Sequence, residues 1–127
     1  MEATASQNSI ILAALVALYR SAAITEAQLQ QAVVECARML GWRVAHFRSA
    51  QTAKGWRTPV SADGAGYPDL TLVRHENLMF AELKTEKGKT SAAQELWLAE
   101  LAVTPAYGVY LWRPSDWLDG SIEAVLR

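Results

Sequence analysis

The sequence predicts an α/β domain in which helices flank a small central sheet, because helical and extended patterns alternate along its 127 residues. Two patterns, Thr25-Glu26-Ala27-Gln28 and Ser91-Ala92-Ala93-Gln94, are capping boxes of the kind that start helices. Short apolar runs between and after these patterns read as strands. The expected order is helix, helix, three strands, helix and strand, followed by short helical pieces.

Length and composition are those of a single globular domain. Hydrophobic residues make up 51% of the chain and charged residues 20%, and its length suits one core. The single cysteine, Cys36, has no partner for an internal disulfide, and we interpret it as a small hydrophobic residue on a helix. The first residues lack the basic start of a signal peptide, and the apolar run 10–18 is too short to cross a bilayer. We therefore expect a soluble cytoplasmic protein with no membrane partner.

An amphipathic helix is expected over residues 9–20, before the segment that carries the polar motifs. Its apolar residues recur at helical spacing: Ile11, Leu12, Leu15, Val16 and Tyr19. Two alternatives stay open for this face. It covers one end of the sheet in its own subunit, or it belongs to a symmetric homodimer interface, for which Trp97 and Leu101 are further candidates.

The second helix is expected from Thr25 to about Leu40, ending at Gly41. Residues 42–49 alternate as a strand does. Residues 51–66 contain glycines, a proline and small polar residues, and predict a long loop. Within this loop Trp56 lies between Lys54 and Arg57 and is a candidate to stack on a base. The alternative, that Trp56 packs onto the core, has equal weight.

A hairpin is expected over residues 66–84. Tyr67 is held extended by Pro68, so Asp69 opens a strand that continues through 70–74. A turn at 75–77 leads to a second strand, 78–84. Alternation along this strand places Glu82 and Lys84 on one face, and the expected register brings Asp69 close to Glu82.

The rest of the chain is expected to form a basic loop over 85–90, a helix from Ser91 to about Val103 and a buried apolar strand over 107–112. Short helical pieces are expected to begin at Pro114 and after Gly120.

Pro68-Asp69, followed by Glu82-Leu83-Lys84, resembles the signature of the PD-(D/E)XK nucleases. Gly66-Tyr67-Pro68-Asp69, with Gln94 downstream, resembles more narrowly the VRR-NUC (virus-type replication-repair nuclease) family. The resemblance implies a restriction-endonuclease-like αβββαβ core over residues 25–113, with a central mixed sheet flanked by helices. A helical extension over 1–24 would precede this core, and a helical tail over 114–127 would follow it.

The resemblance implies a site for Mg²⁺ or Mn²⁺. Asp69 and Glu82 are hard oxygen donors that suit these ions, and the Leu83 backbone carbonyl or waters would complete the shell. Lys84 would orient a water, steady negative charge or accept a proton, and these three roles stay open. In the family pattern a glutamate on the first core helix, matched by Glu26, reaches the metal; a first-turn acid favoured by the helix dipole is the alternative.

Two glutamines complete the implied site. Gln30, four residues after Glu26, would steady that carboxylate or touch a phosphate. Gln94 matches a family glutamine that faces the active site, yet it also closes the capping box of its helix. We expect that one side chain cannot easily do both.

Basic residues are unevenly distributed, although the net charge is only −1. A net charge near zero argues against a protein that binds nucleic acid by bulk charge. No acid occurs from Cys36 to Ala62, so the basic residues of this segment could attract phosphates to a site lined by carboxylates. The expected catalytic residues are Asp69, Glu82, Lys84, Glu26 and Gln94. The residues expected to contact DNA are Gln30, Arg48, Lys54, Trp56, Arg57, Lys87 and Lys89.

These features predict a metal-dependent nuclease that hydrolyses DNA, as an endonuclease or an exonuclease. Selectivity for branched, junction or flap DNA in phage-type replication, recombination or repair is implied by the resemblance, with the host-cell cytoplasm as location if the gene is phage-encoded. The first alternative is a catalytically silent nucleic-acid-binding or assembly domain with the same fold. The second is an ordinary α/β domain in which Glu82 and Lys84 form a weak surface ion pair.

Overall fold

The computed structural model describes residues 4–47, 50–52, 55–57 and 60–127, without the side chains of 17, 18, 50–52 and 55–57. Its elements are α1 (Ala5–Ala23), α2 (Glu26–Met39), β1 (Arg43–His46), β2 (Ala50–Thr52), β3 (Gly55–Arg57), β4 (Leu70–Arg74), β5 (Asn77–Leu83), α3 (Ala92–Ala102), β6 (Gly108–Trp112), α4 (Pro114–Leu118) and α5 (Ser121–Leu126). Strands β1, β4 and β5 pair antiparallel, and β6 pairs parallel with β5. This mixed four-stranded sheet with flanking helices confirms the predicted α/β class and matches the restriction-endonuclease-like arrangement.

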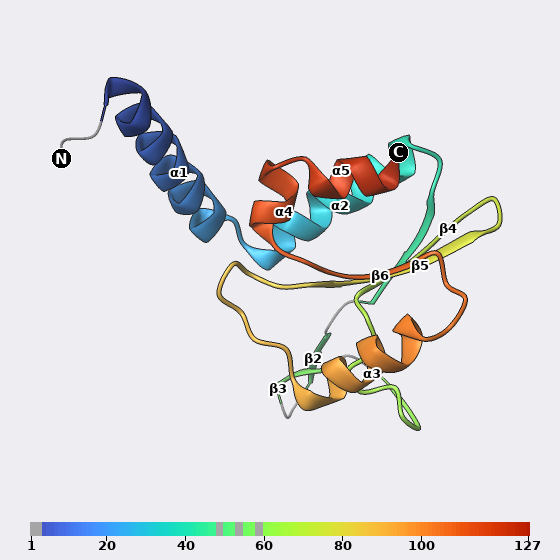
Figure 1. The fold of residues 1–127 in the computed structure, drawn as a ribbon. Coiled ribbons are helices and arrows are strands. Elements are labelled where there is room, and N and C mark those ends of the chain that lie inside the picture. Colours follow the sequence, from blue (N-terminus) through green and yellow to red (C-terminus); the bar gives the residue numbers. More distant parts are fainter. Residues whose placement is uncertain (1–3, 48–49, 53–54, 58–59) are drawn as a thin grey trace.

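Helices cover both faces of the sheet (Figure 1). Helices α2, α4 and α5 lie on one face, and α3 lies on the other together with the β2–β3 pair. The core lies on the α2 side, where apolar side chains from α2, the inner strands and α5 are fully buried: Leu29, Val33, Leu70, Leu72, Met79, Leu83, Ile122 and Leu126. Helix α3 buries no residue completely, so the face of the sheet that α3 covers is less closely packed than the face covered by α2.

Capping boxes start the three longest helices. Thr25 and Gln28 exchange side-chain to backbone hydrogen bonds of 2.9 and 3.1 Å at the start of α2, as predicted. The same pattern at Thr4 and Gln7 starts α1 at Ala5, four residues before the predicted start. The two side chains satisfy backbone N–H groups that have no partner within the helix.

The expectation of a structureless loop over 51–66 was wrong for its first part. Strands β2 and β3 pair antiparallel there, with Ala50 opposite Arg57. Three-residue strands offer no periodicity to detect in a sequence. The predicted DNA contacts Arg48 and Lys54 lie outside the described residues, as do the side chains of Trp56 and Arg57.

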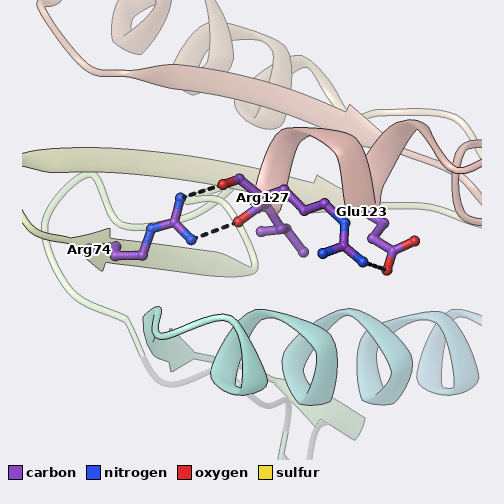
Figure 2. Close-up of polar contacts among 4 residues, drawn as sticks. Arg74, Glu123 and Arg127 are labelled. Carbon is purple, nitrogen blue, oxygen red and sulfur yellow. Dashed lines mark hydrogen bonds and ion pairs between the residues drawn. The ribbon is translucent and has the colours of Figure 1, made fainter.

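The end of β4 and the end of α5 are joined by one arginine (Figure 2). The Arg74 guanidinium donates to the Leu40 and Leu126 carbonyls at 2.9 Å each and to the Arg127 carbonyl at 3.2 Å. It also lies 4.4 Å from the ring centre of Trp42, whose indole N–H donates to the Leu126 carbonyl at 2.8 Å. The C-terminal helices are therefore fixed to the sheet as part of the core.

Helix α1 projects away from the sheet (Figure 1). Its contacts with the body are concentrated on α4. Its large apolar residues are exposed: Ile10, Ile11, Leu12, Leu15, Val16 and Tyr19. The predicted helix is therefore present, but it does not cover the end of the sheet. In the described part of the chain no single helix is long and apolar enough to cross a membrane. Only α1 and α2 taken together have that length and composition, and they are bent by 97° at the break between them.

Candidate active site

A row of side chains crosses three strands on the α3 face of the sheet. Leu70 opposes Ala81, so one further step of the same register places Asp69 opposite Glu82. The Phe47 N–H donates to the Asp69 carbonyl at 3.2 Å, which extends the β1–β4 ladder by one residue. Opposed residues of antiparallel strands share a face, so Phe47, Asp69 and Glu82 point the same way. Lys84, two residues after Glu82, projects to that face as well.

Asp69 is held by the backbone of β5. Its Oδ2 accepts a hydrogen bond from the Leu83 N–H at 2.8 Å. Because the N–H and C=O of one strand residue point to the same side, the Leu83 carbonyl is also directed toward Asp69. The predicted backbone ligand and the predicted carboxylate are therefore on one side of the strand.

Glu82 is a carboxylate with an incomplete set of partners. Its exposed fraction is 1%. Oε1 accepts a hydrogen bond from the Gln94 amide at 3.0 Å, whereas Oε2 has no hydrogen-bond partner within the described residues. Burial, then the negative charge of Asp69 and a hydrogen bond that protonated Glu82 makes to the Asp69 carboxylate, raise the pKa of Glu82 to about 8, and Lys84 opposes this shift. A buried carboxylate beside another is a site that a cation would stabilise.

Glu26 lies at the rim of this site, in the first turn of α2. Partial burial and the charge of Asp69 raise the pKa of Glu26, and Lys84 lowers it. Glu26, Asp69, Glu82 and Lys84 are thus close enough for their charges to act on one another. The hairpin predicted this for Asp69, Glu82 and Lys84, and the family resemblance added Glu26. No ion pair joins Lys84 to a carboxylate in the part of the chain that the structure describes.

Gln94 does what the sequence analysis considered difficult. Its Oε1 accepts a hydrogen bond from the Ser91 N–H at 2.8 Å and closes the capping box. Its Nε2 donates to Glu82 Oε1 at 3.0 Å. The expected competition was wrong, because the two ends of one amide serve the two contacts at the same time. The start of α3 and the Glu82 carboxylate are therefore one unit.

Gly66 allows this contact between α3 and the site. Its φ is +83°, a conformation that favours glycine. A Cβ at this position would lie 2.6 Å from the Ala93 carbonyl carbon and 2.7 Å from the Gln94 nitrogen. The chain thus passes directly against the first turn of α3 just before it reaches Asp69.

A cleft of about 620 Å³ opens beside Asp69, between the length of α2 from Glu26 to Arg38 and the end of β1. Predicted residues Glu26 and Gln30 line it together with His46 and Phe47, which sequence reasoning did not place in the site. Gln30 Nε2 lies 3.4 Å from His46 Nδ1. The alternation of 42–49 assigned His46 and Phe47 to opposite faces of a strand, but it did not indicate that this strand ends at the carboxylates.

The basic loop after β5 is held by an arginine. Arg113 Nη1 donates to the carbonyls of Thr85, Glu86 and Gly88 at 2.7, 3.2 and 2.7 Å. Lys87 and Lys89 are exposed on this loop. Their proposed contact with DNA stays a prediction.

The oxygen atoms at this site suit an ion such as Mg²⁺, which takes few protein ligands and keeps several waters, better than an ion that needs all its ligands from the protein. Among the described residues, no group of three His, Cys, Asp or Glu side chains has the arrangement of a metal site. Mg²⁺ commonly takes one or two carboxylates and keeps several waters. Asp69, the unpartnered Glu82 Oε2 and the nearby Leu83 carbonyl fit that requirement.

Two carboxylates and a lysine thus gather along the two inner strands of a mixed sheet, and a glutamine from the start of α3 contacts one of the carboxylates, an arrangement that suits a nuclease domain. Residues 16–107 match the family model of the VRR-NUC domain, and the chain belongs to this family. Membership implies nuclease activity, with DNA as the substrate. No match was found among curated proteins or among solved structures.

Removal of either cap at α3 is expected to separate the two roles of Gln94. Ser91→Ala loses the hydroxyl that accepts from the Gln94 N–H, and Gln94→Ala loses its capping amide, so each is expected to cost about 0.5–2 kcal/mol of stability. Only Gln94→Ala also removes the donor to Glu82, so it alone should slow cleavage by about 10-fold or more. Thermal unfolding and initial cleavage rates of both variants provide the check. Equal rates in the two would contradict a role of Gln94 at the site.

The raised pKa of Glu82 predicts that the metal-free protein loses stability as pH rises. The unfolded chain releases this proton near the ordinary pKa of 4.5 and the folded chain near 8, so the contribution is complete below 4.5 and lost toward 8. Glu82→Gln should remove this loss and, at pH 8 in chelator, stabilise the fold by about 1–3 kcal/mol. Thermal unfolding at pH 5 and pH 8 tests this, with Glu76→Gln in the exposed β4–β5 turn as control. Parallel pH dependence in wild type and Glu82→Gln would contradict it.

Proposed function

We propose that this chain is a Mg²⁺- or Mn²⁺-dependent nuclease whose ion is held by Asp69, Glu82 and the Leu83 carbonyl, with Glu26 at the rim. The observation that carries the proposal is the buried Glu82. Its Oε2 lacks a hydrogen-bond partner in the described residues, and burial, followed by the negative charge of Asp69, raises the pKa of Glu82 to about 8. A divalent cation would remove both costs.

The side chains of the site divide the work of phosphodiester hydrolysis. A bound divalent ion would polarise the phosphate and lower the pKa of a water. Asp69 is oriented for this by the Leu83 N–H, and Glu82 by the Gln94 amide. Lys84 makes no ion pair with a carboxylate in the described residues, so its ammonium is available to orient the attacking water or to stabilise charge on the phosphate.

The proposed substrate is branched, junction or flap DNA. This part of the proposal comes from the family pattern, as do a role in phage-type replication, recombination or repair and a cytoplasmic location. Exposed Lys87 and Lys89 beside the site are suited to phosphate contacts.

Labelled linear, flap and four-way-junction DNA, each with Mg²⁺, Mn²⁺ or chelator, test the proposal. Cleavage is expected with either ion and none with chelator, and faster on the branched substrates. Cleavage of a closed circle would identify an endonuclease. Binding without cleavage under every condition would refute the proposal and favour the silent binding domain.

A symmetric homodimer is the proposed assembly, with the exposed apolar residues of α1 at its interface. Leu118 of α4 lines a hollow of about 510 Å³ with Leu12 and Val16, which continues this apolar surface onto the body. Burying such side chains would stabilise association by about 25 cal/mol per Å². Sedimentation equilibrium of the full chain and of a chain beginning near Ala23 gives the test. A full chain that is monomeric at micromolar concentration would refute the dimer.

A further inference from the structure

We propose that Phe47 is a stacking platform for the base of an unpaired nucleotide next to the scissile phosphate. The site would then prefer DNA whose strand is unpaired where it is cut. This inference rests on the proposed nuclease function and deepens it, because it assigns a substrate feature to a residue of this chain.

The first observation is the position of Phe47 in the row across the sheet. Its N–H donates to the Asp69 carbonyl at 3.2 Å, so the two residues are directly opposed on neighbouring strands. Opposed residues have Cβ atoms about 4.5–5.5 Å apart and share a face. The phenyl ring therefore emerges beside the carboxylate at which the phosphate reacts.

The second observation is that the ring is supported by a neighbouring aromatic side chain and is still about half exposed. Phe47 is 47% exposed. Tyr67 packs against it edge to face, with ring centres 5.4 Å apart and an interplanar angle of 90°. The Tyr67 ring packs in turn against the rings of Trp97 and Phe80, with ring centres 5.1 and 6.1 Å away. Its hydroxyl lies 3.1 Å from the Thr71 hydroxyl. Such a backing fixes the platform before a ligand arrives.

The third observation is the chemistry of the cleft that Phe47 lines. Among the described residues on its walls carboxylates are in excess, since Glu26, Glu35 and Asp69 line it with Arg38. That balance disfavours a phosphate in the body of the cleft. The amides of Gln30 and Gln31 and the imidazole of His46 line it from the α2 side of β1, around the end of the strand from Phe47, and offer donors and acceptors to a base edge. A volume of about 620 Å³ holds a nucleoside.

The unpaired state follows from the way that a base must be presented. In a duplex both faces of a base are covered by its neighbours, so an aromatic side chain reaches a face only where the strand is single or the base is flipped out. A flap, a gap or a junction centre offers such a base. A closed duplex does not.

Binding separates this role from cleavage. In a Lys84→Ala background with Mn²⁺, fluorescence anisotropy would measure the affinity for a single-stranded 12-mer that contains 2-aminopurine and for a dumbbell duplex with closed ends. Phe47→Leu keeps an apolar contact with Tyr67 but loses the ring. It is expected to weaken binding of the 12-mer by about 5- to 100-fold, to abolish quenching of 2-aminopurine and to change dumbbell binding less than about 2-fold. Phe47→Trp should preserve both the affinity and the quenching.

Each other outcome would overturn the inference. An equal loss on both probes would mean a general binding or folding defect, which thermal unfolding of Phe47→Leu would reveal. Unchanged 12-mer affinity, or no binding of the 12-mer by the parent, would mean that no base stacks on Phe47. These results are distinct from failure of the nuclease proposal, which is decided by cleavage in the wild-type protein.

Discussion

Lys84→Ala is expected to lower the rate of DNA cleavage by about 10²–10⁴-fold while metal binding is retained. An ammonium donates hydrogen bonds but cannot ligate a cation, so its loss should affect the reaction and not the ion. Asp69→Asn and Glu82→Gln remove a carboxylate charge and should lose both, with affinity for Mn²⁺ reduced at least about 10-fold. Calorimetric titration with Mn²⁺ and single-turnover cleavage measure the two properties on the same preparations.

The structure provides controls for these variants. Lys84→Arg keeps the positive charge, so partial recovery of cleavage would indicate charge stabilisation and no recovery would indicate a role in positioning water or accepting a proton. Arg127→Ala removes an exposed cation of α5 that pairs with Glu123 at 2.7 Å, and it should leave both properties unchanged. A loss of Mn²⁺ binding in Lys84→Ala equal to that in Asp69→Asn would contradict the assigned roles.

Trp42→Ala is expected to give the largest loss of stability, about 3–5 kcal/mol. The indole is 3% exposed, packs in the core and donates to the Leu126 carbonyl at 2.8 Å. The Arg74 guanidinium lies 4.4 Å from the centre of its ring, so the cavity would also remove a cation–π contact. Thermal unfolding should shift downward by roughly 10–20 °C.

Two conservative substitutions separate packing from hydrogen bonding. Trp42→Phe loses only the buried N–H donor and part of the ring, and should cost about 1–2 kcal/mol. Trp97→Phe removes a donor to the Asp63 carbonyl in an exposed setting, where water replaces the bond, so its cost should be below about 1 kcal/mol. Equal costs for the two would show that the Trp42–Leu126 bond adds nothing to the junction of sheet and C-terminal helices.

Local chemistry made much of the fold predictable from the sequence. The boxes at Thr25 and Ser91 are complete within four residues, and the helices begin where they indicate. Pro68 and the alternation after it gave the β4–β5 hairpin and the approach of Asp69 to Glu82. The start of α1 was predictable by the same rule, because Thr4 and Gln7 form a third box.

Other features depend on contacts between distant segments. The β2–β3 pair has strands too short to show a period. Phe47 and His46 reach the cleft only because β1 lies beside β4, an order that the sequence does not state. Strand β6 was expected to be buried, yet it lies at the edge of the sheet and Leu111 is 37% exposed.

The double contact of Gln94 links catalysis to local unfolding. Helix α3 buries no residue completely, so its first turn is expected to open at a lower free energy than the core around α2 and β5. Each opening that breaks the Ser91 cap also withdraws the amide from Glu82. Heating would then inactivate the site by fraying of this helix end while the sheet is still folded, so the temperature at which activity declines would lie below the melting temperature.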